Sequence, residues 1–499
     1  MGRLKRALCC VTAGILLSLA PACSGNGEEK IDYTVPEGYL AAYIEEESKR
    51  ETVIGIGAEI DPFWCQLSVG YKGVNEEGQP YECKLSDWEN YVVPRVKEMR
   101  LQRIRSMLLP SFFCNSEQDF LDKNYDWDST AMQSVYLILD MAQEQGIDVL
   151  LNLWGCEANT WLYETMSGTW VSIPKEGKEQ DYCDLFADII DYLINEKGYT
   201  CIKEVTPMNE PNGLYRDIYG SDLAQYKAYA DLCHMLHDTF TERGLRSKVK
   251  FNLADDAASA VWVNNILNEC SDVADIVNSH IYTFEESTTK YDMINNSRTG
   301  LKCYYKAAQE FNIPHMYCEF GTQNFKGDQA TLRKTFTEGI QLARMGISMF
   351  NVGSRGYSLW ILFSQVYGAG LDDCFGLWGF AETGYKIYPA YYAYSLMTRY
   401  VPRGAEIYAL DVDDDNVYVC AFKSGTDWSY LVVNDGAEEK DVAFVNKMSD
   451  IKTMKKYVYA EGNLPTTHQM ITEAEQTFEG RVLGDTIPAK SFVVYTSMS

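Results

Sequence analysis

The chain has 499 residues, which is more than one small domain needs and enough for a barrel of ordinary size with a further module. Hydrophobic residues make up 46% of it and aromatic residues 13%, so a sizeable core is available and a disordered chain is excluded. With 71 acidic and 44 basic residues, the formal net charge is −27, which argues against nucleic acid and anionic lipid as partners.

The N-terminus has the pattern of an export signal. A positive segment at residues 3–6 precedes a short apolar run at residues 11–20, too short to span a bilayer. The next residues, Ala20-Pro21-Ala22-Cys23, resemble a bacterial lipoprotein box, in which Cys23 becomes the lipidated first residue of the mature protein. The alternative is an ordinary signal-peptidase site at Ala20 and Ala22, which would also cut before Cys23.

This pattern predicts an exported bacterial lipoprotein. We expect a signal peptide at residues 1–22 and a polar lipoprotein linker at residues 23–50. The membrane contact would then be a lipid anchor on Cys23 and nothing else. The protein is otherwise expected to be a monomer.

From about residue 53, short apolar runs alternate with amphipathic stretches of helical period. The predicted strands are Ile54–Gly57, Arg103–Leu108, Val149–Leu153, Glu204–Met208, Lys250–Leu253, Ile276–Tyr282, His315–Cys318 and Tyr357–Ile361. The predicted helices are Asp87–Met99, Ser129–Gln145, Asp181–Glu196, Ala224–Arg243, Val261–Cys270, Tyr304–Phe311, Gln329–Met345 and Tyr388–Arg399. Several helices end at a glycine followed directly by the next strand, as at Gly146, Gly198 and Gly244. Eight strands with helical crossovers predict a (β/α)8 TIM barrel over residues 51–402.

The pattern changes after the barrel. Turn-like separators such as Asp413-Asp414-Asp415-Asn416 and Asn434-Asp435-Gly436 divide short β-rich runs. The predicted strands here are Val417–Phe422, Trp428–Val433, Asp441–Val445, Thr453–Tyr459 and Ser491–Tyr495. Residues 403–499 are therefore predicted to form a small antiparallel β-sandwich domain.

Several possible sites are weak. The 15 cysteines include no C-x-x-C pair or zinc-site spacing, and disulfides are possible but cannot be paired from sequence. His234 and His237 lie three apart on a helix predicted for the outer ring, so we expect no metal there. The alternating acids from Asp411 to Asp415 lack the glycine and terminal glutamate of a calcium loop. No phosphate-binding or dinucleotide motif occurs, so no cofactor is expected.

Two predicted strands are each followed by a lone glutamate. Glu210 follows the fourth strand within Thr206-Pro207-Met208-Asn209-Glu210-Pro211, and Glu319 ends the seventh within Tyr317-Cys318-Glu319-Phe320-Gly321. Active sites of this fold lie at the carboxyl ends of the strands, so the two carboxyl groups are expected to converge. Paired carboxyl groups across a cleft are the machinery of glycoside hydrolysis.

With these motifs in place, the barrel resembles clan A glycoside hydrolases. The resemblance implies that Glu319 is the nucleophile and Glu210 the general acid/base, with Arg105 steadying the nucleophile and Asn209 holding the sugar 2-hydroxyl. His280-Ile281-Tyr282 and Glu319-Phe320-Gly321 are similar to motifs of glycoside hydrolase family 5.

Other features separate the chain from family 5. Trp360 matches the tryptophan that floors the subsite of the reacting sugar, but Trp154 stands where family 5 usually has a histidine. The C-terminal β-domain is similar to that of families 30 and 39. The remaining tryptophans near strand ends or loops are Trp64, Trp161 and Trp378. Each is expected to lie in the hydrophobic core and not to serve as a surface on which a sugar ring stacks.

We therefore expect a retaining β-glycosidase that acts on a polysaccharide or oligosaccharide without a metal or other cofactor. Arg105 is expected to favour the charged form of Glu319, and that charge is expected to keep Glu210 protonated for longer. Asp255 and Asp256 follow the fifth strand and are candidates to line the cleft. The alternatives are a lipoprotein that binds glycans without cleaving them and a transglycosylase that uses the same residues.

Overall fold

The computed structural model divides the chain into two compact units, Met1–Asp32 and Tyr33–Ser499, and every helix and strand below belongs to the second. It describes residues 32–62, 72–74, 79–155, 160–166, 171–220, 223–282, 284–322, 332–366, 372–373, 375–451, 453–465, 469–477 and 480–498. The expected signal peptide, Cys23 and Trp64 lie outside these residues. None of the described helices is both long enough and apolar enough to cross a membrane.

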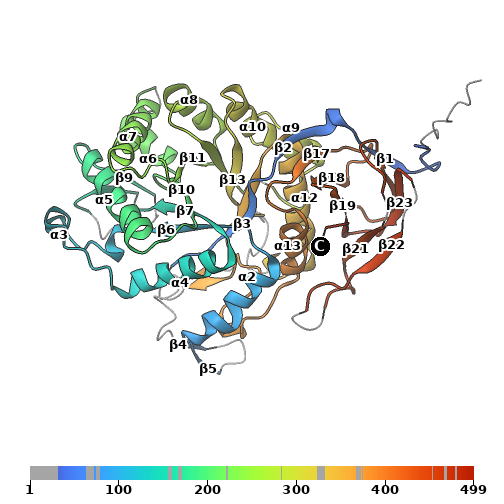
Figure 1. Cartoon of the computed structure of the whole chain (residues 1–499), viewed down its shortest axis with the longest axis horizontal. Helices are drawn as coiled ribbons and strands as arrows, with labels where there is room; N and C mark the ends of the chain where they lie inside the picture. The colour runs from blue at the N-terminus through green and yellow to red at the C-terminus, as the bar shows by residue number, and fades with distance from the viewer. Residues whose placement is uncertain are drawn as a thin grey trace, which may run out of the picture. The chain divides into compact units, whose positions relative to one another are not determined.

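Eight parallel strands close into a barrel in chain order, which confirms the predicted fold (Figure 1). They are β3 (Gly55–Glu59), β6 (Arg103–Leu108), β7 (Asp148–Leu153), β10 (Ile202–Thr206), β11 (Lys250–Ala257), β12 (Ile276–Ile281), β13 (His315–Phe320) and β14 (Gly356–Leu359). The strands differ from the prediction only at their ends. Their carboxyl ends therefore meet at one end of the barrel, where this fold places its active sites.

The helices between the strands also follow the prediction, with one displacement. They are α2 (Val93–Met99), α4 (Thr130–Gln145), α5 (Glu179–Asp191), α7 (Leu223–Glu242), α8 (Ala260–Cys270), α10 (Leu301–Glu310), α12 (Phe336–Val352) and α13 (Pro389–Tyr400). Helix α12, expected to end at Met345, continues through Gly346 and ends at Gly353. A Cβ at position 346 would lie 2.4 Å from the Tyr357 hydroxyl, so this glycine permits close packing instead of ending the helix.

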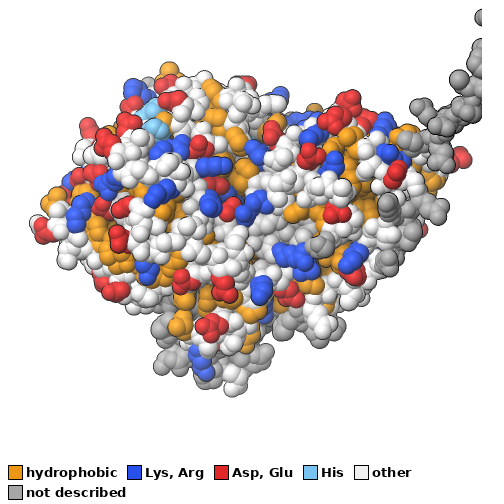
Figure 2. Space-filling model, viewed as in Figure 1, with side chains coloured by type: hydrophobic (Ala, Val, Ile, Leu, Met, Phe, Trp, Pro, Cys, Tyr) orange, Lys and Arg blue, Asp and Glu red, His pale blue; other side chains and the backbone are white. Residues whose placement is uncertain are grey.

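Shorter elements fill the connections. They are η1 (Glu46–Ser48), β4 (Lys72–Val74), β5 (Pro80–Glu82), η2 (Trp88–Val92), η3 (Pro110–Phe112), α3 (Glu117–Asp122), β8 (Tyr163–Thr165), β9 (Ser172–Pro174), η5 (Tyr192–Glu196), α6 (Asn212–Tyr219), α9 (Lys290–Asn295), β15 (Gln365–Val366), β16 (Asp372–Asp373) and η6 (Ala381–Thr383). On the face shown in Figure 2, acidic side chains are interspersed with basic ones.

The C-terminal domain consists of two sheets, in the orders β2-β17-β18-β19-β24-β21-β22 and β1-β20-β23. Its strands after the barrel are β17 (Glu406–Ala409), β18 (Val417–Ser424), β19 (Asp427–Asn434), β20 (Lys440–Asn446), β21 (Thr453–Ala460), β22 (Ala474–Thr477), β23 (Val482–Ile487) and β24 (Ser491–Thr496). Side chains of both sheets, among them Val432, Phe444 and Leu483, bury one apolar core, as a β-sandwich requires.

Part of the expected linker belongs to this domain. Strand β1 (Leu40–Ile44) pairs in parallel with β20, and β2 (Lys49–Thr52) pairs antiparallel with β17. The prediction of a linker over residues 23–50 is therefore wrong for these residues. Strand β1 is a short apolar run and β2 is polar, and neither alternates clearly between apolar and polar residues; each lies at the edge of its sheet.

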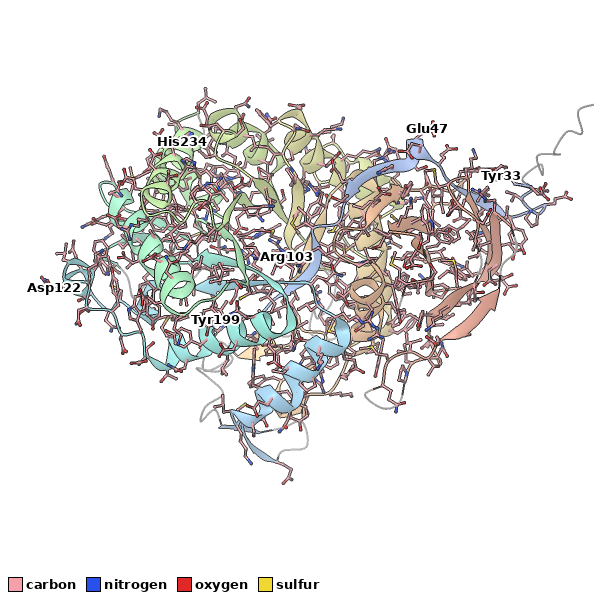
Figure 3. The ribbon with its side chains drawn as sticks, in the orientation of Figure 1. Tyr33, Glu47, Arg103, Asp122, Tyr199 and His234 are labelled. Atoms are coloured by element: carbon pink, nitrogen blue, oxygen red, sulfur yellow. The ribbon has the colours of Figure 1, made fainter. Side chains whose placement is uncertain are left out.

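Inside the barrel, away from the carboxyl ends of the strands, the lumen holds a buried ion pair. Arg103 on β6 donates through both terminal nitrogens to Glu204 on β10, and Asn252 donates to the same carboxylate (2.7 Å). Figure 3 labels Arg103 within the barrel and His234 on the outer helix α7. Each member of this pair is at most 3% exposed, so removing either side chain would leave the charge of the other buried without a partner.

Candidate active site

Glu210 lies in the turn between β10 and α6. Its φ is 46°, in the left-handed region, and its N–H donates to the Asp255 carbonyl (3.0 Å). A non-glycine residue held there by its neighbours is characteristic of functional sites. The Glu210 side chain is 26% exposed, more open than the other acids around it.

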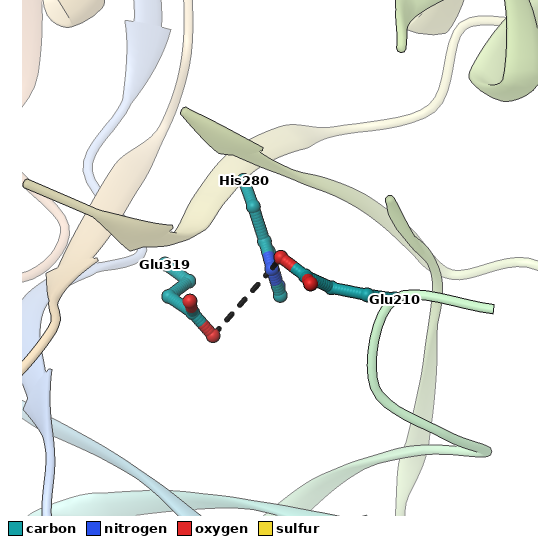
Figure 4. A group of neighbouring side chains, drawn as sticks. All are labelled: Glu210, His280 and Glu319. Carbon is teal, nitrogen blue, oxygen red and sulfur yellow. Dashed lines mark hydrogen bonds and ion pairs between the residues drawn. The ribbon is translucent and has the colours of Figure 1, made fainter. Parts of the chain in front are cut away.

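Glu319 reaches the same place from β13. The register between β12 and β13 shifts at Ser279/His280, and that between β13 and β14 shifts between Tyr317 and Phe320. Such an irregularity re-aims a side chain, here the carboxyl group of Glu319. One carboxylate oxygen of Glu319 and one of Glu210 lie within 4.8 Å of each other, with His280 between the two side chains (Figure 4).

Arg105 on β6 holds four groups at once. Its Nη1 donates to Glu59 (2.8 Å) and to Glu319 (3.1 Å). Its Nη2 donates to Asn209 Oδ1 and to Asp255 Oδ2, at 2.8 Å each. The guanidinium is 0% exposed, so this forked set of donors fixes the relative positions of residues from five segments of the barrel.

His280 on β12 is surrounded by carboxylates. Its Nδ1 lies 2.9 Å from Glu210 Oε1 and 3.5 Å from Glu319 Oε2, and its Nε2 lies 3.1 Å from Asp255 Oδ1. An ionised carboxylate only accepts hydrogen bonds, so the ionised neighbours of His280 favour a proton on the ring nitrogen that each one contacts. Burial alone would lower the pKa of His280, but Glu319 and Asp255 hold it well above its usual value. These neighbours therefore favour the imidazolium form of the ring.

The acids differ in their proton affinity. Burial raises the pKa of Glu319 above its usual range, and the cations His280 and Arg105 only partly offset the rise. Arg105 favours the charged form of Glu319, as expected, but the nearly complete burial of this carboxyl outweighs the cation. For Asp255 the cations prevail over burial and lower the pKa to about 2.

Tyr282 and two tryptophans complete the site. The Tyr282 hydroxyl donates to Glu319 Oε1 (2.8 Å). The indoles of Trp154 and Trp360 lie nearly parallel, with ring centroids 6.2 Å apart, and the Arg105 guanidinium lies over Trp154 at 5.7 Å. The Trp360–Ile361 peptide bond is cis. Of these rings Trp154 is buried and Trp360 is only partly buried, so Trp360 is the more accessible to a sugar.

Two carboxyl groups at this site were not among the predicted site residues. Asp255, considered only as a possible cleft residue, joins Arg105 to His280 and also accepts from Asn152 (2.8 Å). Glu59 ends β3 and was missed entirely. The rule that selected Glu319, an acid at the carboxyl end of a barrel strand, would have selected Glu59 as well.

Other candidates lie elsewhere. Trp378 is 0% exposed in the core, and Trp161 stacks on Phe120. His234 pairs with Asp272 (3.0 Å) at the surface, away from the barrel lumen. Asp256 accepts from the Ser259 backbone N–H and makes no contact with Arg105 or His280 among the described hydrogen bonds. The described cysteines, Cys83, Cys114, Cys183, Cys201, Cys233, Cys270, Cys303, Cys318 and Cys420, are all free thiols.

Glu210, His280 and Glu319 each offer one atom that a metal ion could use. In its protonated form His280 has no lone pair for a metal, and Arg105 already donates to Glu319. The site is therefore built for moving protons between carboxyl groups, with two fixed cations to balance the charge.

No family model and no curated protein sequence matches the chain. Solved structures do match it over nearly its whole length. A family 30 endoxylanase from Clostridium papyrosolvens C71 is 12% identical, with a TM-score of 0.62 over 92% of this chain and 100% of that one. An endo-β1,6-glucanase is 15% identical, with a TM-score of 0.63 over 91% and 93%.

A family 39 enzyme from Xanthomonas axonopodis pv. citri is 15% identical, with a TM-score of 0.58 over 93% of this chain and 99% of that one. The structural neighbours are thus glycoside hydrolases of families 30 and 39, as the resemblance predicted, and the chain shares their barrel and β-domain fold.

Proposed function

We propose that this protein is a retaining β-glycoside hydrolase, with Glu319 as nucleophile and Glu210 as general acid/base. The observation that carries the proposal is the asymmetry of the two facing carboxyl groups. Glu319 is 10% exposed and receives hydrogen bonds from Arg105 and Tyr282, whereas Glu210 is 26% exposed and contacts His280. A carboxyl group held by two donors and facing a more open acid is what double displacement needs.

In the first step, a Glu319 oxygen attacks the anomeric carbon and forms the ester. The bond from that carbon to the leaving oxygen breaks, and Glu210 gives its proton to this oxygen. An oxygen of each carboxyl group lies within 4.8 Å of one of the other, and this short separation suits direct attack by Glu319. An inverting enzyme needs a wider separation, because a water must fit between the two groups.

In the second step, Glu210 takes a proton from water, and the oxygen of that water attacks the anomeric carbon. The ester bond to Glu319 breaks and its electron pair returns to the carboxylate. Arg105 and Tyr282 then stabilise the negative charge as it reappears. Two displacements at one carbon retain its configuration.

The test compares wild type with Glu319→Gln on β-linked xylan, β1,6-glucan and a broad panel of aryl β-glycosides. We expect wild-type cleavage with a product whose first-formed anomer is β, seen by NMR, and a loss of nearly all turnover in the variant. A 2-fluoro glycoside should label wild type by one sugar mass on Glu319. Normal hydrolysis by Glu319→Gln would refute the assignment.

The same panel separates the alternatives. Binding of a glycan by wild type, without release of reducing sugar from any substrate, would favour a glycan-binding lipoprotein. Redistribution of chain lengths without net hydrolysis would favour a transglycosylase. The two facing carboxyl groups, Glu210 and Glu319, have distinct hydrogen-bond partners, and this argues against a barrel that binds glycans without cleaving them.

We also propose that the protein is exported and tethered through a lipid on Cys23, with polysaccharide degradation as its role. The support is the n-region, the apolar run and the lipobox-like segment of the sequence. Labelling with a fatty-acid analogue should mark wild type and leave Cys23→Ser unlabelled. Equal labelling of both would refute the tether.

A further inference from the structure

Glu59 is a fully buried carboxyl group that the proposed mechanism does not use. It ends β3, is 1% exposed, and accepts through Oε2 from Arg105 Nη1 (2.8 Å). Its Oε1 is buried and has no hydrogen-bond donor among the described residues. A buried oxygen without a donor disfavours the ionised form of the group.

The nitrogen that binds Glu59 also binds the proposed nucleophile. Arg105 Nη1 has two hydrogens, and one points to Glu59 while the other points to Glu319 at 3.1 Å. Any negative charge on Glu59 therefore competes with Glu319 for the same cation.

The surroundings of Glu59 favour a neutral carboxyl. The charged groups that face it are Asp61 on its own segment, Arg105 on β6 and Glu319 on β13. On the β14 side, the Leu362 backbone N–H donates to the Glu59 carbonyl. Burial raises the pKa of Glu59 to about 8 against the Arg105 charge, and Asp61 adds to the rise.

The balance of charges leads to the same conclusion. Glu59, Asp61, Asp255, Glu210 and Glu319 bring five carboxyl groups to this end of the barrel, against two cations, Arg105 and His280. Five anions cannot be buried beside two cations without a large cost. Some of these acids must hold protons, and the buried Oε1 of Glu59, which no described donor reaches, favours a proton on that group.

We propose that Glu59 is a positioning residue that serves the reaction only in its protonated form, leaving the charge of Arg105 to Glu319. This inference rests on the proposed retaining mechanism. When the ester bond to Glu319 breaks, a carboxylate must reform beside Arg105. An ionised Glu59 shares that cation and opposes the new charge, so the second step slows when Glu59 loses its proton.

An activated substrate isolates this step. With a dinitrophenyl β-glycoside, the leaving group needs no proton, and breakage of the ester limits kcat. Glu210 then acts as a base, so kcat should rise with pH to a plateau, and a fall in alkali reports a group that must keep its proton. For wild type we expect a fall above about pH 8, because only about a tenth of Glu59 keeps its proton at pH 9.

Two variants change this fall in opposite ways. Glu59→Gln has no proton to lose, so the plateau should persist to pH 9.5. Asp61→Asn removes the charge that helps hold the Glu59 pKa up, so the fall should begin at lower pH than in wild type. Asp148→Asn is the matched control, since burial also raises the pKa of this carboxyl, which starts β7 at the opposite end of the barrel.

The outcomes are distinct. An alkaline fall in Glu59→Gln like that of wild type, or a flat wild-type profile to pH 9.5, would overturn the role of Glu59 while leaving the proposed function standing. No turnover of any β-glycoside by wild type would instead remove the proposed function. Circular dichroism at pH 9 checks folding, and if Glu59→Gln does not fold, the direction of the Asp61→Asn shift decides.

Discussion

Replacing Tyr282 by phenylalanine removes one hydroxyl group from the proposed site and keeps the ring. That ring packs closely, because a Cβ on Gly321 would lie 3.0 Å from its Cε1. The lost interaction is the 2.8 Å hydrogen bond to Glu319 Oε1. Glu319 is neutral as an ester and regains its charge when the ester breaks, so we expect the second step to lose most.

The magnitude follows from the kind of bond. A hydrogen bond to a charged group contributes about 1.5–3 kcal/mol, and a tenfold change in rate corresponds to about 1.4 kcal/mol. The second step should therefore slow about 10- to 150-fold. The first step should change less, since the ionised carboxylate of the free enzyme loses the same bond and becomes the more reactive nucleophile.

The assay measures kcat and KM with an activated aryl β-glycoside, together with intact mass. In Tyr282→Phe, kcat should fall, KM should fall with it, and the glycosyl-enzyme should accumulate during turnover. Tyr357→Phe is the control, since this buried hydroxyl on β14 has no hydrogen-bond partner among the described residues. A drop in kcat/KM with kcat unchanged would refute the reasoning.

Three further predictions concern stability. Gly57→Ala should lower the melting temperature by an amount equivalent to about 1–3 kcal/mol, because the new Cβ would lie 2.4 Å from the Arg103 carbonyl oxygen. Gly213→Ala is the control and should not lower it, because its Cβ would lie 3.5 Å from its nearest neighbour. Equal melting temperatures for the two variants would contradict this prediction. Arg103→Met should lower the free energy of unfolding by about 3–5 kcal/mol in a urea titration, because it leaves the charge of Glu204 buried without a partner. Adding Glu204→Leu should restore part of the loss. No recovery in the double variant would show that the unpaired Glu204 charge is not the cause. A chain ending at residue 402 should be insoluble, because β1 and β2 lose β20 and β17; a soluble, folded product would refute this.

The barrel could be predicted because its signals are local. Apolar runs of strand length, amphipathic helices and glycine stops such as Gly146, with φ of 69°, each depend on a few neighbouring residues. The strand count then located Glu210 and Glu319 at the same end of the barrel. The end of helix α12 was predicted too early, at Met345, just before Gly346. Gly346 allows close packing against Tyr357, and Gly353 caps the helix; the sequence does not distinguish a glycine needed for packing from one that ends a helix.

Edge strands and bulges were harder to predict. Strands β1 and β2 lie hundreds of residues from β20 and β17 in the chain, and their pairing depends on the whole domain being assembled. The register shift at Ser279/His280 is invisible in a pattern of alternation, yet it aims Glu319 into the site.

What the sequence determined by itself is the eight-strand barrel and the two glutamates at strand ends, because periodicity and position along a strand are properties of short segments. What only the tertiary structure decided is the charge of each group. The four partners of Arg105, the carboxyl groups around His280 and the buried Glu59 come from residues on different strands. Proton affinity depends on distances and burial in space, so it exists only once the barrel has closed.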